Sequence, residues 1–411
     1  MNPTIRIKLS FMMFLEFFIW GAWFVTLGTF LAANLTASGS QTAAVFSTQS
    51  WGAIIAPFII GLIADRYFNA EKILGILHLI GAILMYQMYK ASDITVFYPY
   101  VFAYMVLYMP TLALVNSVSF NQMKDPEKEF STIRIWGTLG WIAAGLLISY
   151  YFHWDSQAGT GAGLLKNTFL MAGIASLVLG VFSFALPKTP PKVATGEKVK
   201  VSELLGLDAL KLLKDKNFLI FFVSSILICI PLAFYYQNAN LFLSTIGVDN
   251  PTGKMTIGQA SEVLFLLFIP IFFKKFGFKK TILVGMIAWA IRYVFFAYGN
   301  AGELSFMLIL GIALHGICYD FFFVSGQIYT NSKAGERFKS SAQGLITLAT
   351  YGIGMLIGFA IAGMIKDSYA YADGSGFDWK MIWIIPAVIA FVVFLLFALL
   401  FNDKTKTETN V

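Results

Sequence analysis

The chain contains few charged residues and very few cysteines. Asp, Glu, Lys and Arg make up 12% of its 411 residues, whereas a soluble globular domain carries roughly a quarter. The two cysteines, Cys229 and Cys318, both fall inside apolar runs, so the sequence indicates no disulfide framework and no cysteine metal site. This composition excludes an ordinary soluble domain and a disulfide-stabilised secreted protein.

The sequence also lacks the motifs of the common enzyme classes. It contains no G-x-x-x-x-G-K-[ST] phosphate loop, so ATP is not the expected energy source. It has no His/Cys cluster of metal-site spacing, no serine in a nucleophile elbow and no loop long enough for a soluble domain. We therefore expect no enzyme activity, no cofactor and no resident metal, and we expect the chemistry to lie inside membrane spans.

Long apolar runs dominate the sequence. Hydrophobic residues account for 58% of the chain, and the mean hydropathy is +0.73. A spanning helix needs about 20 mostly apolar residues, and twelve such runs predict an all-α membrane protein with twelve transmembrane helices. The runs are 9–33, 41–63, 70–90, 95–120, 130–152, 165–186, 217–244, 255–273, 280–299, 304–329, 340–365 and 380–401.

Lys and Arg are distributed unevenly among the predicted loops. If the N-terminus is cytoplasmic, the inside segments hold 22 of them and the outside loops hold 5. Because cytoplasmic loops carry the excess of positive charge, both termini are predicted to be cytoplasmic. The net charge of +7 then reflects the inner membrane face and does not indicate a nucleic-acid partner. We expect a multi-pass protein of a cell membrane, specifically a bacterial inner membrane.

One polar segment divides the runs into two sets of six. It is rich in Pro and Lys at first, and then Leu204, Leu207, Leu210 and Leu213 recur at near-helical spacing beside lysines. This pattern predicts a cytoplasmic tether followed by an amphipathic helix on the membrane surface. The predicted domains are an N-terminal six-helix bundle (1–186), the linker (187–216), a C-terminal six-helix bundle (217–401) and a cytoplasmic tail (402–411).

Ionisable side chains inside the spans are rare. A charge at mid-membrane costs about 2.5 to 3.5 kcal/mol on insertion scales, so each one is a functional candidate. Arg292 lies near a span end, where its long stem is expected to reach the interface. His78 lies in a span without a polar stripe, and we interpret it as structural. The remaining candidates are Glu16, Arg134, Glu262 and Asp320.

In the first half, Arg134, Thr138 and Trp141 are spaced to form one stripe on one helix face. Arg supplies a planar fork of donors and Trp a flat surface for stacking, so this stripe suits a polar ligand that contains a ring. Glu16 and Trp20 are likewise one turn apart. Small residues in the span of Arg134 should allow a neighbouring helix to approach closely. These are Gly137, Gly140 and Gly145.

In the second half, three spans carry polar side chains. Gln259 and Glu262 are one turn apart, and Asp320 adjoins a face formed by His315 and Tyr319. Pro231 is expected to break its helix and free backbone groups that a cavity can use. The residues that follow it include Tyr236, Gln237 and Asn240. A different interpretation, that the amides only hold helices together, stays open for Gln237, Asn240 and Gln259.

Both halves place a short basic turn after their second span, GLIADRYFNAEK (61–72) and FFKKFGFKK (272–280). With six plus six spans and a cytoplasmic linker, the chain resembles the major facilitator superfamily. Gly61, Asp65 and Arg66 match part of that superfamily's G-x-x-x-D-[RK]-x-G-[RK]-[RK] turn, whose later glycine and basic pair are missing here. The resemblance implies a gating role for Asp65 and Arg66.

Several segments in both halves resemble the nucleoside:proton symporter family within that superfamily. They are IRIWGT (133–138), SEVLFLLFIPIFF (261–273), AWAIRYVFFAYG (288–299), YDFFFVSG (319–326) and SAQG (341–344). The resemblance implies import of nucleosides together with protons by alternating access. It also implies ligand contacts at Arg134, Thr138, Gln259 and Glu262, and a second membrane carboxylate at Asp320.

The chain departs from the family pattern at the wall expected to face the base. Ala233 and Tyr236 stand where amides are expected, Trp141 where a phenyl ring is expected, and Glu16 where a neutral amide is expected. A symporter for another polar ring compound, such as a sugar or amino sugar, therefore remains an alternative. A membrane enzyme or receptor is the third, and the missing catalytic constellation and extramembrane domain speak against it.

The predicted site combines substrate-binding and proton-coupling side chains. The expected partners are a small-molecule substrate, protons and the lipid bilayer, and we expect a monomer. Glu262 is predicted to bind substrate and exchange a proton, and Asp320 and Glu16 are competing additional coupling sites, of which Asp320 matches the family. The predicted substrate-binding residues are Arg134, Thr138, Trp141, Tyr236, Gln237, Asn240, Gln259, Glu262, His315 and Tyr319.

Overall fold

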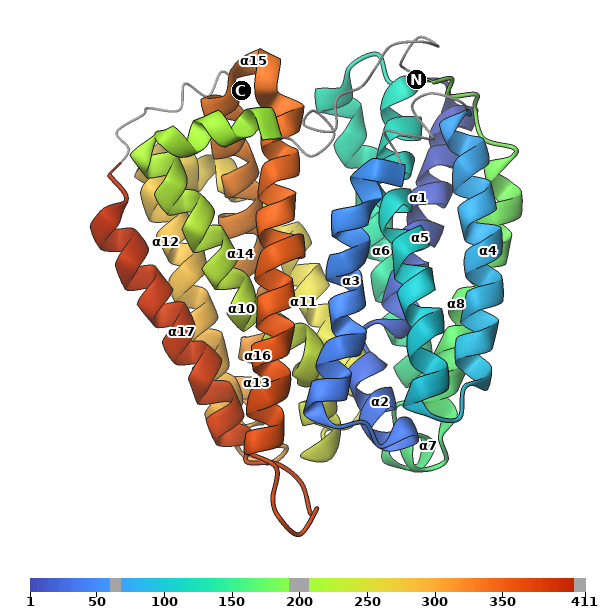
Figure 1. The fold of residues 1–411 in the computed structure, drawn as a ribbon, viewed down its shortest axis with the longest axis vertical. Helices are drawn as coiled ribbons and strands as arrows, with labels where there is room; N and C mark the ends of the chain where they lie inside the picture. Colours follow the sequence, from blue (N-terminus) through green and yellow to red (C-terminus); the bar gives the residue numbers. More distant parts are fainter. Residues whose placement is uncertain (60–67, 192–206, 403–411) are drawn as a thin grey trace. The chain divides into compact units, whose positions relative to one another are not determined.

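The structure, a computed structural model, describes residues 1–59, 68–191 and 207–402. Nearly all of these residues are helical (Figure 1), apart from loops and an isolated β-bridge that joins Ala370 to Phe377. Within the described residues, ten helical stretches are long and apolar enough to cross a membrane. The predicted class, an all-α membrane protein, is therefore confirmed.

The chain divides into two compact units. Unit 1 comprises Met1–Lys200 and Asp249–Thr256, and unit 2 comprises Val201–Val248 and Ile257–Val411.

Unit 1 is built around a long first helix that packs along the sixth and eighth helices. Two of its elements are not α-helical: η2 is a π-helix and η3 is a short 3-10 helix. Its elements are α1 (Pro3–Trp23), α2 (Leu27–Leu35), α3 (Gly39–Ile59), α4 (Ala70–Lys90), α5 (Ile94–Asn121), α6 (Pro126–Leu146), η2 (Leu147–Tyr151), α7 (Gln157–Gly161), η3 (Leu164–Lys166) and α8 (Asn167–Ser183).

Unit 2 contains two further π-helices, η5 and η6, within otherwise α-helical stretches. Its elements are η4 (Leu207–Lys214), α10 (Lys216–Thr245), α11 (Pro251–Leu266, whose first residues belong to unit 1), α12 (Ile269–Tyr298), α13 (Ser305–Ala313), α14 (His315–Tyr319), η5 (Asp320–Val324), α15 (Ser325–Thr347), η6 (Leu348–Gly354), α16 (Met355–Ser368) and α17 (Trp379–Leu400).

Short polar side chains begin four of the long helices. Asn2 accepts a hydrogen bond from the Thr4 backbone N–H at the start of α1, and Pro3 has no N–H that would need an acceptor. Asp93, Asp215 and Asp378 cap α5, α10 and α17 in the same way. These caps satisfy N–H groups that an apolar helix could not satisfy with its own side chains.

The prediction that Pro231 breaks its helix is wrong. Helix α10 is 30 residues long and passes through Pro231 without a break. The Tyr293 hydroxyl donates to the Pro231 carbonyl at 2.5 Å, so the neighbouring helix supplies an extra partner at this point. Membrane helices tolerate proline because their neighbours re-satisfy backbone groups, and an intact helix keeps its remaining hydrogen bonds away from lipid.

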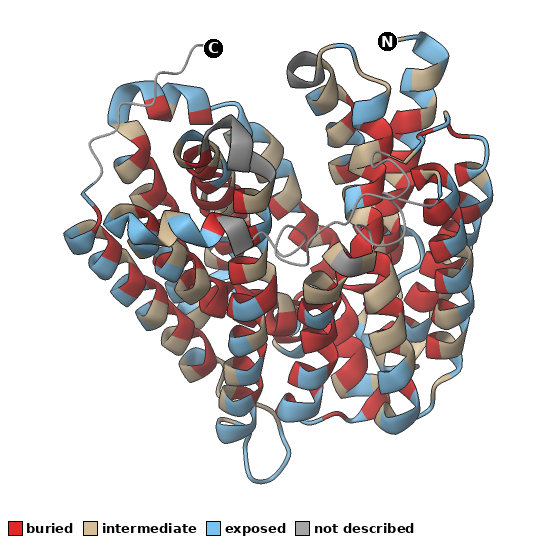
Figure 2. Ribbon diagram, turned by 45° about the horizontal axis from the view of Figure 1, so that its top comes forward, coloured by how far each residue is buried: buried red, intermediate tan, exposed pale blue. Residues whose placement is uncertain are grey.

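The predicted close approach at the α6 glycines is confirmed. A Cβ added to Gly140 would lie 2.1 Å from the Phe14 carbonyl oxygen of α1, and one added to Gly137 would lie 2.6 Å from the Phe17 ring. A similar seam in unit 2 places Gly354 and Gly358 against α10. The buried residues shown in Figure 2 follow such inward faces within each unit.

The first turn of α11 belongs to unit 1 because side chains of unit 1 cap it. Asp155 Oδ2 accepts from the Thr252 N–H at 2.9 Å, and Ser149 Oγ accepts from the Gly253 N–H at 2.7 Å. The Ser149 hydroxyl in turn donates to Asp155 Oδ2. A carboxylate at a helix N-terminus satisfies free N–H groups and opposes the helix dipole.

The structure differs from the prediction for the linker helix and agrees with it for the second basic turn. The described part of the predicted amphipathic helix is η4, a 3-10 helix, which has three residues per turn. The leucine spacing had predicted an α-helix, which is wound less tightly. The turn at 272–280 is confirmed, because Gly277 has a left-handed φ of 73° inside α12 and divides it into two helical parts.

Candidate functional site

The predicted polar stripe of unit 1 lies on one face of α6. Arg134, Thr138 and Trp141 are each partly exposed. The Arg134 guanidinium lies 4.0 Å from the centre of the Phe17 ring, and the Trp141 ring lies 5.6 Å from that of Trp20. The two α1 aromatics therefore support the stripe from one side and leave polar donors available to a ligand. The sequence reasoning missed Phe17.

Glu16 lies on α1 and is buried, so it does not belong to the partly exposed stripe on α6. Its side chain is 0% exposed, its Oε2 lies 2.8 Å from His78 Nε2, and the Thr111 hydroxyl lies 2.6 Å from its Oε1. The Ser176 hydroxyl lies 3.1 Å from the other ring nitrogen of His78. No sequence pattern links these residues, because they come from four different helices.

In unit 2, Gln259 and Glu262 lie on α11, and both are partly exposed. Ser261, between them, accepts from the Gly316 N–H at 3.0 Å, and a Cβ added to Gly316 would lie 2.5 Å from the Ser261 carbonyl carbon. This close packing holds α11 against α14 and brings Glu262 near the segment that contains Asp320.

Glu262 and the side chains around it form one polar cluster within unit 2. The charge of Glu262 is within electrostatic range of Tyr236, Tyr319 and Asp320. The Tyr319 hydroxyl lies 2.6 Å from that of Tyr351, a residue that sequence reasoning missed. Four residues predicted from three different spans therefore gather in one place.

Asp320 is the most isolated carboxyl group of this cluster. It is 1% exposed, and its Oδ2 has no hydrogen-bond partner among the described residues. It begins the π-helix η5, a geometry that often occurs at functional sites. Because an uncompensated charge is costly to bury, this carboxyl group is a candidate for a site that takes up and releases a proton.

The expectation that Arg292 reaches the membrane interface is wrong. Its side chain is 0% exposed, and the guanidinium lies 3.6 Å from the Tyr235 ring centre and 5.6 Å from that of Phe296. Its Nη1 lies 3.1 Å from His315 Nδ1. Stacking on aromatic faces is the physical reason that this cation can remain inside the bundle.

Unit 2 buries three of the predicted substrate-binding residues, which are Gln237, Asn240 and His315. His315 stacks on Tyr235 with ring centres 5.4 Å apart, and Asn240 is also enclosed. Neither amide atom of Gln237 has a partner among the described residues, and the same holds for Asn238, which sequence reasoning missed. Buried polar side chains without a protein partner are rare, which makes these amides candidates for polar ligand contact.

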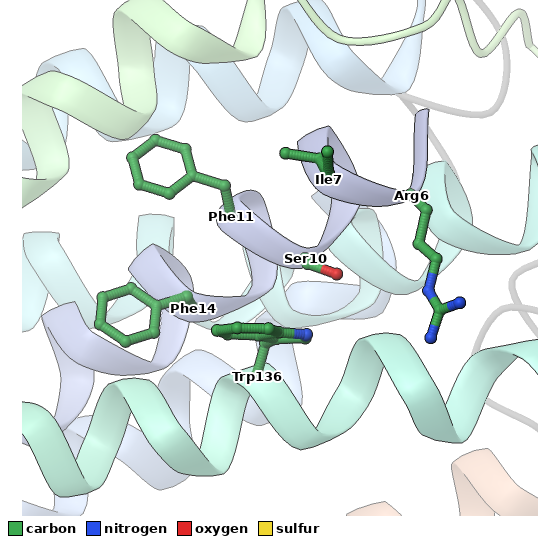
Figure 3. A pocket seen from close by; sticks show the side chains of 6 residues that line it. All are labelled: Arg6, Ile7, Ser10, Phe11, Phe14 and Trp136. Atoms are coloured by element: carbon green, nitrogen blue, oxygen red, sulfur yellow. The ribbon is translucent and has the colours of Figure 1, made fainter. Parts of the chain in front are cut away.

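A cavity of about 590 Å³ lies in unit 1 (Figure 3). It is lined by α1 residues and by one aromatic residue of α6, and none of them is a predicted substrate contact. They are Arg6, Ile7, Ser10, Phe11, Phe14 and Trp136. Arg6 and Ser10 are the polar members of this lining, and the other four side chains are apolar or aromatic.

Two further predictions concern gating and metals. Asp65 and Arg66 lie outside the described residues. Within the described ranges, no group of three or more His, Cys, Asp or Glu side chains could hold a metal ion.

Apolar helices in two compact units, with polar side chains inside them, are typical of polytopic secondary transporters. The sequence pattern of the family described as Nucleoside H+ symporter matches residues 2–406. The chain belongs to this family.

Relatives and a solved structure agree with this assignment. The chain is 43% identical to YegT of Escherichia coli (strain K12), provisionally named a nucleoside transporter, over 98% of this chain and 95% of YegT. It is 33% identical to the xanthosine permease of the same organism, over 96% of this chain and 95% of the permease. The crystal structure of the nucleoside transporter NupG superposes with a TM-score of 0.87 at 29% identity, covering 98% of this chain and all of that chain.

Proposed function

We propose that the chain is a proton-coupled importer of nucleosides that works by alternating access. Twelve transmembrane helices in two six-helix bundles, with both termini cytoplasmic, would carry this function as a monomer in a bacterial inner membrane. Membership of the Nucleoside H+ symporter family is the observation that carries the proposal. The names of NupG and the xanthosine permease support nucleosides as the substrate class.

Unit 1 supplies the donors and the stacking surface. Arg134 offers a planar fork to the oxygen atoms of a base, and Trp141 offers a partly exposed indole to its ring. The Phe17 ring under the guanidinium holds the fork in place, because a cation over an aromatic face is attracted to it. Thr138, on the same face, adds a hydroxyl that can donate or accept.

Unit 2 supplies the acceptors and the proton site. Glu262 can accept hydrogen bonds from ribose hydroxyls, and Gln259 can both donate and accept. Tyr236 and Tyr319 adjoin them within the range of the Glu262 charge, and we assign these residues to substrate contact. Asp320, isolated and buried beside this cluster, is assigned to proton exchange.

Coupling follows from the nearness of two carboxyl groups in one low-dielectric cluster. Like charges at short range disfavour double ionisation, so a proton on Asp320 favours a charged Glu262 that can accept from substrate hydroxyls. A proton that moves inward at 100 mV releases about 2.3 kcal/mol, which is enough for a substrate ratio of roughly fiftyfold. Asp65 and Arg66 are proposed to gate the cytoplasmic side.

The test uses purified protein in proteoliposomes. Labelled uridine, adenosine and xanthosine are offered with and without an inwardly directed proton gradient, and sugars and amino sugars are added as competitors. Accumulation of a nucleoside that requires the gradient and resists the sugars supports the proposal. Competition by a sugar, with no nucleoside accumulation, would overturn it and leave the other polar-ring symporter.

A further inference from the structure

The hydrogen bonds around Glu16 determine where protons lie in the core of unit 1. The Ser176 Oγ lies 2.9 Å from the His78 carbonyl oxygen and 3.1 Å from His78 Nδ1. A hydroxyl has one hydrogen, and the carbonyl can only accept it. The Ser176 hydroxyl therefore donates to the carbonyl, and His78 Nδ1–H donates to Ser176 Oγ.

This assignment leaves two possible protonation states for the bond between His78 and Glu16. With Nδ1 protonated, His78 is either a neutral ring whose Nε2 is an acceptor or a cation whose Nε2 is a donor. In the first case Glu16 Oε2 must carry the proton, and in the second it is an anion. In both cases one proton lies in the 2.8 Å bond between Nε2 and Oε2, and the pair is neutral overall.

Burial opposes any change in that net charge. The two side chains are 0% and 1% exposed, so a lost or extra proton would leave an uncompensated charge inside the bundle. The Thr111 hydroxyl lies 2.6 Å from Glu16 Oε1 and 2.6 Å from its own helix's Tyr108 carbonyl, so it can adapt to either location of the proton. The other titratable or charged groups nearby are Tyr104, Tyr108 and, acting on Tyr108, Arg134.

The pair also anchors α1 to the rest of unit 1. It joins α1 to α4, the Thr111 hydroxyl joins α1 to α5, and the Tyr108 hydroxyl donates to the Glu16 carbonyl at 2.7 Å. The next residue, Phe17, lies under Arg134, and Trp20, one turn on, lies against Trp141. A single turn of α1 therefore carries both the anchor and the aromatic support of the substrate stripe.

We infer that Glu16 and His78 hold one trapped proton in a net-neutral clamp that positions α1 against the Arg134 and Trp141 stripe. This inference rests on the proposed function only for its transport readout. Glu16 is then a positioning residue, and the proton exchanged during transport is carried elsewhere.

Charge balance distinguishes this clamp from other roles. Glu16→Gln places an amide N–H where the shared proton lies and keeps an oxygen toward Thr111, so it should preserve melting temperature and nucleoside KM. His78→Gln keeps a polar group near Nε2 but removes the ring nitrogen that shares the proton, so the buried Glu16 must either stay charged without a cation or hold the proton without its histidine partner. That variant should lower the melting temperature by several degrees and raise KM by roughly tenfold, the factor given by about 1.4 kcal/mol.

The double variant Glu16→Gln/His78→Gln has no ionisable side chain at this place and should recover most of both losses relative to His78→Gln alone. Both variants lack the Nδ1 contact with Ser176, so the comparison isolates the charge. Vmax per molecule of protein should stay within about twofold of wild type in all three, because the clamp acts on α1 and not on proton exchange.

Glu71 provides the matched control. It is also buried in unit 1, but both of its oxygens accept from N–H donors, Oε1 from Asn69 Nδ2 and Oε2 from the Thr189 backbone, each at 2.9 Å. An amide at this position sets two donors against each other, so Glu71→Gln should lower the melting temperature. This result would show that the assay detects a Glu→Gln penalty where the bonding predicts one.

Each outcome decides the inference. If Glu16→Gln costs as much stability as His78→Gln and the double variant is worse than either, the clamp is refuted in favour of ordinary packing. If Glu16→Gln melts normally but loses gradient-driven accumulation, the pair exchanges its proton and the inference is wrong. If wild type melts normally but transports no nucleoside, the proposed function fails, while the melting comparison still tests the clamp.

Discussion

Arg292 Nη1 lies 3.1 Å from His315 Nδ1, and both side chains are buried. A guanidinium only donates, so Nδ1 accepts and the ring's hydrogen lies on Nε2. His315 is therefore fixed as a neutral donor toward whatever approaches its other edge. The pair shows how a cation on one helix sets the hydrogen-bonding role of a predicted substrate contact on another.

Arg292→Lys should lower both the melting temperature and the nucleoside affinity. A lysine keeps the charge but loses the flat surface that stacks on Tyr235 and the directed bond that fixes His315. Thermal melting of the detergent-solubilised protein, with and without nucleoside, measures both effects. Arg6→Lys, at an exposed position, is the control and should change neither. A normal melting curve for Arg292→Lys would refute this account.

Glu262→Gln should abolish uptake driven by a proton gradient and leave the protein folded in the membrane. The change removes an acceptor and the charge that acts on Asp320, Tyr236 and Tyr319, and it keeps the side-chain volume. Accumulation in proteoliposomes is the measurement. Glu303→Gln, at an exposed loop position, should accumulate substrate normally. Concentrative uptake by Glu262→Gln at the wild-type level would remove Glu262 from the mechanism.

Arg134→Lys should weaken nucleoside binding about tenfold or more, a loss of about 1.4 kcal/mol. The ammonium can still lie over Phe17, but it cannot present the planar pair of donors that a base edge requires. Direct binding to the purified protein by calorimetry tests this. Equal affinity for the Lys variant would reduce Arg134 to a charge partner.

Asp320→Asn should retain nucleoside exchange across the membrane and lose accumulation against a gradient. Its Oδ2 has no partner among the described residues, so an amide of the same shape disturbs little packing while removing the exchangeable proton. Counterflow and gradient-driven uptake are compared in the same vesicles, with Asp373→Asn in an exposed loop as the control. Glu16→Gln should retain both activities. The reverse pattern would move the coupling role to Glu16.

Gly140→Ala should severely reduce the yield of folded protein. The added methyl would lie 2.1 Å from the Phe14 carbonyl oxygen, which forces α1 away from α6. Gly344→Ala meets nothing within 4 Å and should be neutral or stabilising by about 0.5 to 1 kcal/mol, the usual advantage of Ala over Gly in a helix. Monodispersity after solubilisation measures both. A well-folded Gly140→Ala protein would show that this seam adapts.

The family and the helical class could be predicted from the sequence because a bilayer imposes strong local rules. A span must be long, apolar and helical, and any charge inside it stands out. The stripe of Arg134, Thr138 and Trp141 followed from helical spacing alone, since all three lie on one helix. The caps at Asn2 and Asp93 depend on equally local geometry.

Contacts between helices were decided only by the tertiary structure. Spacing along one helix cannot show that Glu16 meets His78, 62 residues away, or that Arg292 stacks on Tyr235. The same limit explains why Arg292 was expected at the interface and why Pro231 was expected to break its helix. An arginine remains inside a bundle, and a proline inside a helix, when neighbouring helices supply aromatic faces and hydrogen-bond partners. Those neighbours are set by packing, which the order of residues along one span does not determine.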